Sequence, residues 1–169
     1  MFRILREKPD DSDEVELLFD LAFAPGRTAL SSYRLRDGVD PVADLSLVVR
    51  DGYDAIAGAI RYWPVRVGAA GAPALLLGPV AVHPTRQGEG LGALLIADSL
   101  ERARDRDWSR VILVGDEPYY RRFGFSRDAA RGLDYPPPTN PDRLLARALM
   151  PGAFEGVEGM VRRWSDGAG

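Results

Sequence analysis

Apolar residues recur at helical spacing near the start of the chain and at strand-like spacing after it. One face of the first predicted helix carries Val15, Leu18, Phe19, Ala22 and Phe23, which indicates a helix packed on a core. The pattern predicts a strand over residues 2–6, then that helix, capped at Asp11-Ser12-Asp13 and ended by Pro25-Gly26, and then a short helix over residues 28–36.

Two apolar segments joined by a glycine turn follow, and they predict a hairpin of strands. The strands span residues 44–50 and 54–63, and Asp51-Gly52 between them is a strong turn signal. After a loop from Gly68 to Pro73, the run from Ala74 to Val82 is apolar without interruption. Such a run is typical of a central strand that is covered on both faces.

Pro79 lies inside that apolar run, where a regular strand needs an amide hydrogen at every second residue. Because proline has none to donate, we expect the strand to bulge or splay there. The remaining predicted elements are a helix over residues 90–106, a strand over residues 111–114 and a closing strand from Leu144 to Leu149. This order predicts a mixed α/β fold in a single domain of residues 1–169, with helices flanking one sheet.

Composition narrows the class of protein and the chemistry that it can carry. The chain has 169 residues, of which 46% are apolar and 28% charged, as in an ordinary globular domain. No apolar run approaches the roughly 20 residues that cross a bilayer, and the segment Met1–Arg6 is too charged for a signal peptide, so we expect a cytoplasmic protein. A net charge of −3 argues against general binding of nucleic acid.

The absence of cysteine excludes disulfides, cysteine nucleophiles and thiolate metal sites. His83 is the only histidine, and no spaced cluster of carboxylates suggests a metal site, so no metal is expected. The one lysine, Lys8, is not part of a Walker A loop.

The segment that carries chemistry is a glycine-rich turn between an apolar strand and a helix. It consists of Gln87, Gly88, Glu89, Gly90, Leu91 and Gly92. Glycines let the backbone approach a ligand closely, and the first amides of a helix have no partners within it, so the turn suits a phosphate. The glycine spacing does not match the Rossmann fingerprint, and a P-loop would need its lysine.

The spacing Gln-x-x-Gly-x-Gly resembles the acyl-CoA loop of the GNAT superfamily of N-acetyltransferases. Val82-x-Pro84 before it and Tyr120-x-x-x-Gly124-Phe125 after it also stand where that family has them. The sequences of these motifs are most similar to those of the bacterial branch of predicted acetyltransferases related to YhbS. The resemblance covers residues 2–131 and leaves a C-terminal strand and turn extension, residues 132–164, and a frayed tail, residues 165–169.

The resemblance implies a mostly antiparallel, twisted sheet that splays between the strands near residues 75–82 and 110–114. It also implies acetyl-CoA as the cosubstrate. The amides from Gln87 to Gly92 would hold its pyrophosphate, and Val80, Ala81 and Val82 would present backbone groups to its pantetheine arm. The amide of Val82 is the expected donor to the thioester carbonyl oxygen.

Acyl transfer also needs a proton for the departing thiolate and a base for the amine. The resemblance implies Tyr120 as the general acid; the alternative is that Tyr119 and Tyr120 only pack under the sheet. Asp116 is the candidate base, with Glu117 beside it; the alternative is that they begin a helix, Asp116 as its N-cap. His83 adjoins the glycine turn, where packing or capping is the alternative to catalysis.

The sequence therefore predicts an N-acetyltransferase that moves an acetyl group from acetyl-CoA to a primary amine by direct attack in a ternary complex. A non-catalytic acyl-CoA sensor and a binding module for another anionic nucleotide are the alternatives. The acceptor amine is not identified by any motif. Residues 136–142, with four prolines, can form a substrate lid or a contact of a homodimer.

Overall fold

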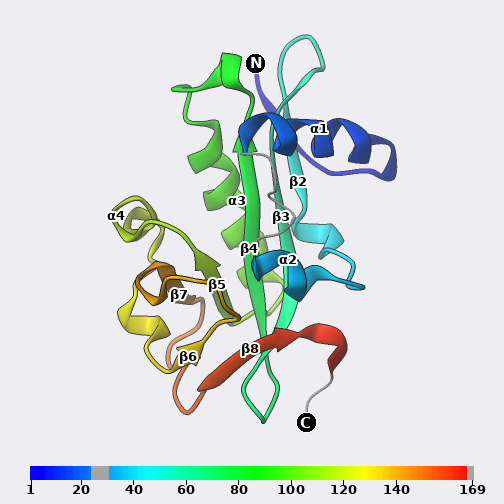
Figure 1. Cartoon of the computed structure of the whole chain (residues 1–169). Helices are drawn as coiled ribbons and strands as arrows, with labels where there is room; N and C mark the ends of the chain where they lie inside the picture. Colours follow the sequence, from blue (N-terminus) through cyan, green and yellow to red (C-terminus); the bar gives the residue numbers. More distant parts are fainter. Residues whose placement is uncertain (24–30, 167–169) are drawn as a thin grey trace.

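One sheet runs through the molecule, and the computed structural model describes it within residues 1–23 and 31–166 (Figure 1). Its strands follow the order β1-β2-β3-β4-β5-β7. They are β1 (Arg3–Arg6), β2 (Leu47–Arg50), β3 (Ile56–Val67), β4 (Ala72–Val82), β5 (Arg110–Val114) and β7 (Leu144–Ala148). Neighbouring strands are antiparallel except β4 and β5, which are parallel. The predicted mixed and mostly antiparallel sheet is confirmed.

Two further strands at one end of the sheet were not predicted from the sequence. The strand β8 (Gly159–Arg163) pairs with β3 at Val65 to Val67, and β6 (Leu133–Asp134) pairs with β8. Both strands are short and lack a run of alternating apolar residues, so no local pattern marks them. The predicted strand from Leu144 to Leu149 is confirmed as β7, but it is not the last strand of the chain.

Helices cover both faces of the sheet. They are α1 (Ser12–Ala22), α2 (Ser31–Arg36), α3 (Leu91–Asp105) and α4 (Glu117–Tyr120). Short 3-10 helices span Pro9–Asp11, Ala43–Leu45, Pro84–Arg86, Arg121–Phe123, Asp128–Ala130, Pro141–Arg143 and Trp164–Asp166. Figure 1 shows α1 and α2 on the face of the sheet opposite to α3. Among the residues that the structure describes, no helix is long and apolar enough to cross a membrane.

Each helix and strand predicted up to β5 has a counterpart among the described residues, with local differences. The first helix begins at Ser12 as expected, but Asp11 forms no side-chain cap and instead pairs with Arg50. The strand predicted from residue 44 begins only at Leu47, because Ala43–Leu45 is a 3-10 helix. Residues 28–30 and the Pro25-Gly26 stop lie outside the described residues.

The two faces of the sheet have separate cores. Val15, Leu18 and Phe19 of α1 pack with Ala59 and Ala81. Leu91, Leu95 and Leu100 of α3 pack on the other face with side chains such as Ile60 and Tyr62. Because β3 and β4 are covered on both sides, their continuous apolar runs are explained.

The strand β4 bulges at the position that Pro79 predicts. Ile60 pairs with Val80 and Tyr62 pairs with Leu77, so Gly78 and Pro79 together oppose the single residue Arg61. The extra residue interrupts the ladder exactly where proline has no hydrogen to donate. The predicted irregularity is therefore confirmed as a bulge.

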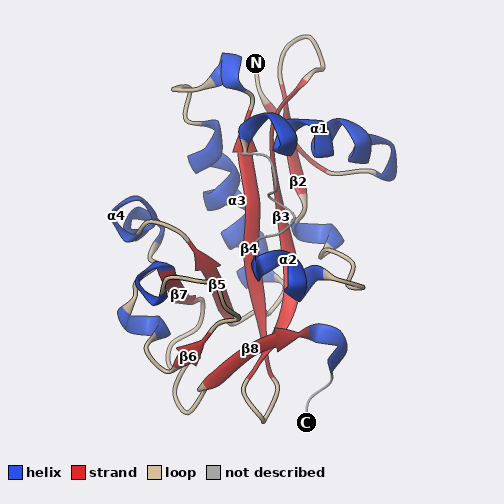
Figure 2. Ribbon diagram, viewed as in Figure 1, coloured by secondary structure: helices blue, strands red, loops and turns tan. Residues whose placement is uncertain are grey.

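The strands β4 and β5 separate after Leu76, just before the bulge. They pair only at Leu75 with Val111 and at Leu76 with Ile112, although β4 continues to Val82 and β5 continues to Val114. Figure 2 shows β5 diverging from β4 toward α4. The predicted splay is confirmed, and it opens the sheet next to the glycine turn.

Candidate functional site

The glycine turn that follows β4 leaves its backbone open to solvent. Gly88 and Gly90 have φ angles of 86° and 76°, a left-handed conformation that favours glycine. A Cβ atom added at either position would meet no other atom within 4 Å. The helix α3 begins at Leu91, so its first amides, which have no partner within the helix, are presented beside this turn.

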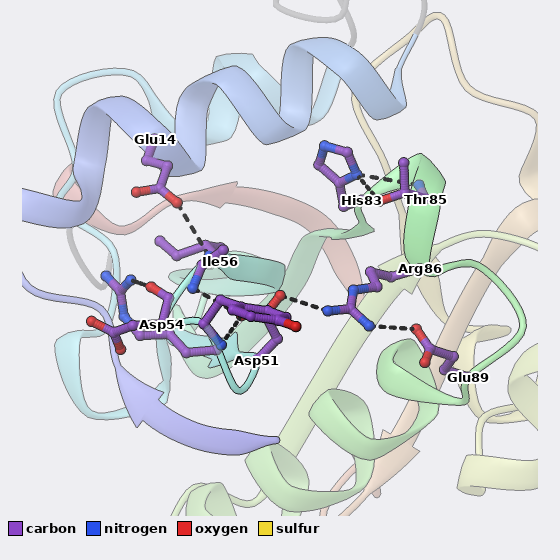
Figure 3. Close-up of polar contacts among 11 residues, drawn as sticks. Glu14, Asp51, Asp54, Ile56, His83, Thr85, Arg86 and Glu89 are labelled. Atoms are coloured by element: carbon purple, nitrogen blue, oxygen red, sulfur yellow. Dashed lines mark hydrogen bonds and ion pairs between the residues drawn. The ribbon is translucent and has the colours of Figure 1, made fainter. Parts of the chain in front are cut away.

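Arg86 ties the glycine turn to the hairpin between β2 and β3 (Figure 3). Its guanidinium lies 2.6 Å from a carboxylate oxygen of Asp51 and 3.6 Å from one of Glu89. Asp51 also accepts hydrogen bonds from the amides of Ala55 and Tyr53, at 3.0 and 2.8 Å. The hydrogen bond from the Ala55 amide, and to a smaller extent the one from Arg86, holds the pKa of Asp51 below its ordinary value. The carboxylate thus stays charged and anchors Arg86.

His83 and Gln87 hold the two ends of the connection between β4 and the turn. Nδ1 of His83 accepts a hydrogen bond from the amide of Thr85 at 3.2 Å, so His83 caps the 3-10 helix Pro84–Arg86, in agreement with the packing or capping alternative. The side-chain amide of Gln87 donates to the carbonyl oxygen of Val82 at 3.1 Å. His83 is not among the residues that line the cavity described below.

The outer half of β4 directs alternate amides into the gap between the strands. His83 donates its amide hydrogen to the carbonyl oxygen of Ala57 on β3, at 2.8 Å. Because successive residues of a strand point their amides to opposite sides, Val82 and Val80 direct theirs away from β3. Ala81 has the reverse orientation, and its side chain is buried beneath α1.

A cavity of about 630 Å³ occupies the space between the separated strands. It is lined by Phe23, Ser32, Tyr33, Arg36, Leu77, Gly78, Pro79, Val80, Leu113, Val114, Gly115, Asp116, Tyr119, Tyr120, Pro138, Thr139, Asn140 and Arg143. Of the residues that the sequence predicts for the site, Val80, Asp116 and Tyr120 are thus brought together. Ala81, Val82 and the glycine turn are not part of this lining.

Tyr119 and Tyr120 stand edge to face at the mouth of the gap, with ring centres 5.0 Å apart. Tyr120 is the more buried of the two and also contacts Phe125, with ring centres 6.1 Å apart. Burial raises the pKa of Tyr120 to about 12. Its ring lies so close to Gly115 that a Cβ there would stand 2.5 Å from a ring carbon. The phenol therefore keeps its proton in neutral solution.

The two carboxylates after β5 differ in their surroundings. Asp116 occupies the N-cap position of α4 without a side-chain cap, and its exposed carboxylate lies 3.3 Å from a guanidinium nitrogen of Arg143. Glu117 accepts a hydrogen bond from the amide of Arg127 at 2.8 Å and does not line the cavity. Asp116 is thus the one of these two that faces the gap.

Sequence patterns did not identify the residues of α2 that line one wall of the cavity. Ser32, Tyr33 and Arg36 come from α2, and the opposite wall comes from residues 138–143. The proline-rich segment was predicted as a lid or a dimer contact, but no motif marks Arg36. Only the packing of α2 against the distant end of the chain could have identified it.

No group of three metal-ligating side chains gathers in residues 1–23 and 31–166. Tyr62 of β3 is fully buried and hydrogen-bonds to Ser99 at 2.7 Å. It belongs to the core.

A family model and the sequences of known proteins both match this chain. Residues 3–127 match the family model described as an acetyltransferase (GNAT) domain. The chain is 27% identical over 155 residues to the uncharacterized N-acetyltransferase YhbS of Escherichia coli K12, covering 92% of each protein.

Solved structures share the arrangement of strands and helices. The GNAT family N-acetyltransferase YhbS from Escherichia coli, in complex with CoA, has a TM-score of 0.83 at 26% identity, covering 96% of this chain and 89% of that one. A GNAT family acetyltransferase from Brucella melitensis, in complex with acetyl-CoA, has a TM-score of 0.67 at 29% identity, covering 89% and 90%.

Proposed function

Because the chain belongs to the acetyltransferase (GNAT) family, we propose that it transfers an acetyl group from acetyl-CoA to a primary amine by direct attack in a ternary complex. The relatives crystallised with CoA and with acetyl-CoA support the choice of cosubstrate. The chain has no cysteine, so an acyl-cysteine intermediate is impossible. Among the side chains that line the cavity, Tyr120 is the best placed proton donor.

The single observation that carries this proposal is the gap between β4 and β5. Three features that the reaction needs meet at this gap. They are the open amides at the start of α3, the amides of β4 that point away from β3, and the buried phenol of Tyr120. The amides of Gln87 to Gly92 would hold the pyrophosphate, as they carry the positive end of the helix dipole. Pantetheine would then follow β4 toward the cavity.

The lining of the cavity favours Val80 over Val82 as the oxyanion donor. Both amides point into the gap, but only Val80 lines the cavity, whereas the carbonyl of Val82 accepts from Gln87. We therefore assign the amide of Val80 to the thioester oxygen and place Val82 along the pantetheine arm. A preorganised donor of this kind contributes roughly 3–4 kcal/mol to transition-state stabilisation.

The chemical step forms the amide bond and breaks the thioester bond. The amine nitrogen attacks the thioester carbon, the carbonyl oxygen gains negative charge beside Val80, and the C–S bond then breaks. Tyr120 donates its phenolic proton to the departing thiolate. The proton of the attacking amine leaves through solvent or to Asp116, which faces the gap.

A thiol-release assay with acetyl-CoA tests the proposal across panels of amines, amino acids, polyamines and antibiotics. Release that depends on an acceptor, together with the acetylated product by mass spectrometry, is the expected result. Release from none of these acceptors, with CoA still raising the melting temperature, would instead support the acyl-CoA sensor. If saturating CoA leaves the melting temperature unchanged, the gap does not bind CoA, because a ligand at 100 times its Kd stabilises by about 2.7 kcal/mol.

A further inference from the structure

Arg36 brings a positive charge from α2 to the point where β4 bulges. Its side chain lines the cavity. A Cβ atom added at Gly78 would lie 3.7 Å from one terminal nitrogen of Arg36, so the guanidinium stands beside the bulge. Gly78 precedes Val80 by two residues, which is roughly 7 Å along a strand. The guanidinium is therefore within the length of a small molecule of the amide assigned to the thioester oxygen.

Aromatic side chains hold this guanidinium in place. Its central carbon lies 4.2 Å from the ring centre of Tyr33 and 5.3 Å from that of Trp63. Trp63 is itself fixed, because its indole nitrogen donates to the carbonyl oxygen of Gly78 at 2.8 Å. Stacking of this kind stabilises a guanidinium and restricts its orientation without neutralising its charge.

The second wall of the cavity is joined to the helix that carries Arg36. The hydroxyls of Ser32 and Tyr135 are hydrogen-bonded at 2.7 Å. Arg34 donates to the carbonyl oxygen of Pro137 at 3.0 Å. These contacts place α2 against the proline-rich segment, so Arg36 is positioned by both walls of the cavity.

The charges of the cavity favour one class of acceptor over another. In the described part of the chain, the charged side chains of the lining are Arg36, Arg143 and Asp116. Asp116 and Arg143 lie 3.3 Å apart, and the formal charges of these three described residues sum to +1. A polycationic acceptor would bring like charge into this space, whereas an acceptor with an anionic group would complement it.

We infer that the acceptor is a small amine that also carries a carboxylate, and that Arg36 binds this carboxylate. The inference rests on the proposed acetyl transfer. A guanidinium carries a full positive charge, and its hydrogen bonds to a carboxylate are charge-assisted and therefore stronger than those between neutral groups. With the carboxylate at Arg36, the amine of the same molecule can reach the thioester beside Val80.

The test compares acceptors that differ in this charge, with each rate referred to the unprotonated amine because a carboxamide also lowers the amine's pKa. Free α-amino acids and ω-amino acids of increasing length are each assayed with acetyl-CoA beside their own carboxamides, which keep the amine and lose the negative charge. For the best acid, kcat/KM should exceed that of its amide by about 10- to 100-fold in the wild type. Arg36→Gln should bring this ratio close to one, mainly by lowering kcat/KM for the acid, and Arg36→Lys should restore part of it.

The ratio keeps the test independent of folding. Both acceptors are measured on the same preparation, so a partly unfolded variant lowers both rates equally and leaves their ratio unchanged. Arg131→Gln is the matched control, since Arg131 is exposed and does not line the cavity, and it should keep the wild-type ratio.

Three results would overturn the inference. Equal rates for every acid and its amide would leave acetyl transfer standing but remove the carboxylate from the acceptor. If Arg36→Gln keeps the wild-type ratio of kcat/KM for the acid to that for its amide, the carboxylate binds to another residue. Acetylation of neither member of any pair, under conditions where CoA binds, would refute the proposed transfer itself and the inference with it.

Discussion

Tyr120 owes its chemical properties to its neighbours rather than to its own type. Its ring is enclosed by Tyr119, Phe123 and Phe125 and lies against Gly115, which has no Cβ to displace it. This burial raises its pKa to about 12 and keeps the phenol protonated. A protonated phenol that faces the gap is suited to give a proton to a thiolate.

Replacement of the phenol tests this assignment. Tyr120→Phe should lower kcat by about 100-fold with little change in KM for acetyl-CoA, because a general acid acts in the transition state. Steady-state kinetics with a saturating acceptor measures both constants. Tyr53→Phe is the control, since Tyr53 is 92% exposed and outside the cavity. An unchanged kcat for Tyr120→Phe, with a large loss for Tyr119→Phe, would move the acid to Tyr119.

The same burial makes stability depend on pH at the alkaline end. The pKa of Tyr120 rises from an ordinary 10 to about 12 on folding, so the folded chain holds this proton more tightly than the unfolded chain. Its contribution to the free energy of unfolding is complete below pH 10 and is lost as the pH rises toward 12, by roughly 3 kcal/mol at most.

Urea unfolding between pH 9 and 12 checks this dependence. Tyr120→Phe should flatten part of the alkaline decline in the free energy of unfolding. Tyr62 and Tyr135, whose pKa values are also raised by burial, should maintain the remainder. A decline as steep as in the wild type would contradict the buried state of the Tyr120 phenol.

At the scale of elements, the turn between β4 and α3 is held from outside itself. The glycines supply the shape of the turn, but Arg86 connects it to Asp51 on the hairpin and to Glu89 within the turn. Asp51 is almost fully buried, so this connection starts from a fixed point. The hairpin therefore sets the position of the amides that we assign to the pyrophosphate.

Loss of that connection should weaken binding of the cosubstrate. Arg86→Gln should raise KM for acetyl-CoA about tenfold and change kcat little, because the amides would be positioned less well in both the ground and transition states. Isothermal titration with CoA gives the matching change in Kd. Arg102→Gln removes an arginine that pairs with Asp98 on α3, and it should change neither constant. A wild-type Kd for Arg86→Gln would show that the glycines suffice alone.

At the scale of the whole molecule, a buried ion cluster joins the start of the chain to the bulge. Arg61, which opposes Gly78 and Pro79 on β4, donates to both carboxylate oxygens of Glu7, at 2.9 and 2.8 Å. It also pairs with Glu16 of α1. Arg61 is 8% exposed and Glu7 is also largely buried, whereas Glu16 is half-exposed, so the cluster connects β3 with the residue after β1 and with α1.

Breaking this cluster should destabilise the fold strongly. Arg61→Met would leave Glu7 buried without its partner, which costs about 3–5 kcal/mol in comparable cases. Arg3→Met is the matched control, since Arg3 pairs with Asp54 at the surface and should change stability by less than about 1 kcal/mol. Urea denaturation measures both. A small loss for Arg61→Met would mean that packing, rather than the ion cluster, holds β1 and α1 in place.

The sequence by itself determined the parts of the site that depend on neighbours in the chain. Glycines at 88 and 90 set the left-handed turn, the periodicity of residues 91–105 forms the helix behind it, and Pro79 sets the bulge. Each of these results follows from backbone sterics and hydrogen bonding within a few residues. For that reason the anion-binding turn and the irregular strand could be predicted, with the function class that they indicate.

The tertiary structure alone decided which side chains face the gap. Ser32 meets Tyr135 across 103 residues of chain, and their contact brings α2 and the proline-rich segment to the cavity. Arg36 enters the cavity through this packing, and no local pattern distinguishes it from an exposed arginine. Contacts at such separation depend on how all the strands pair and which faces the helices cover. A sequence pattern reports the neighbours along the chain, whereas the acceptor side of this site is made by neighbours in space.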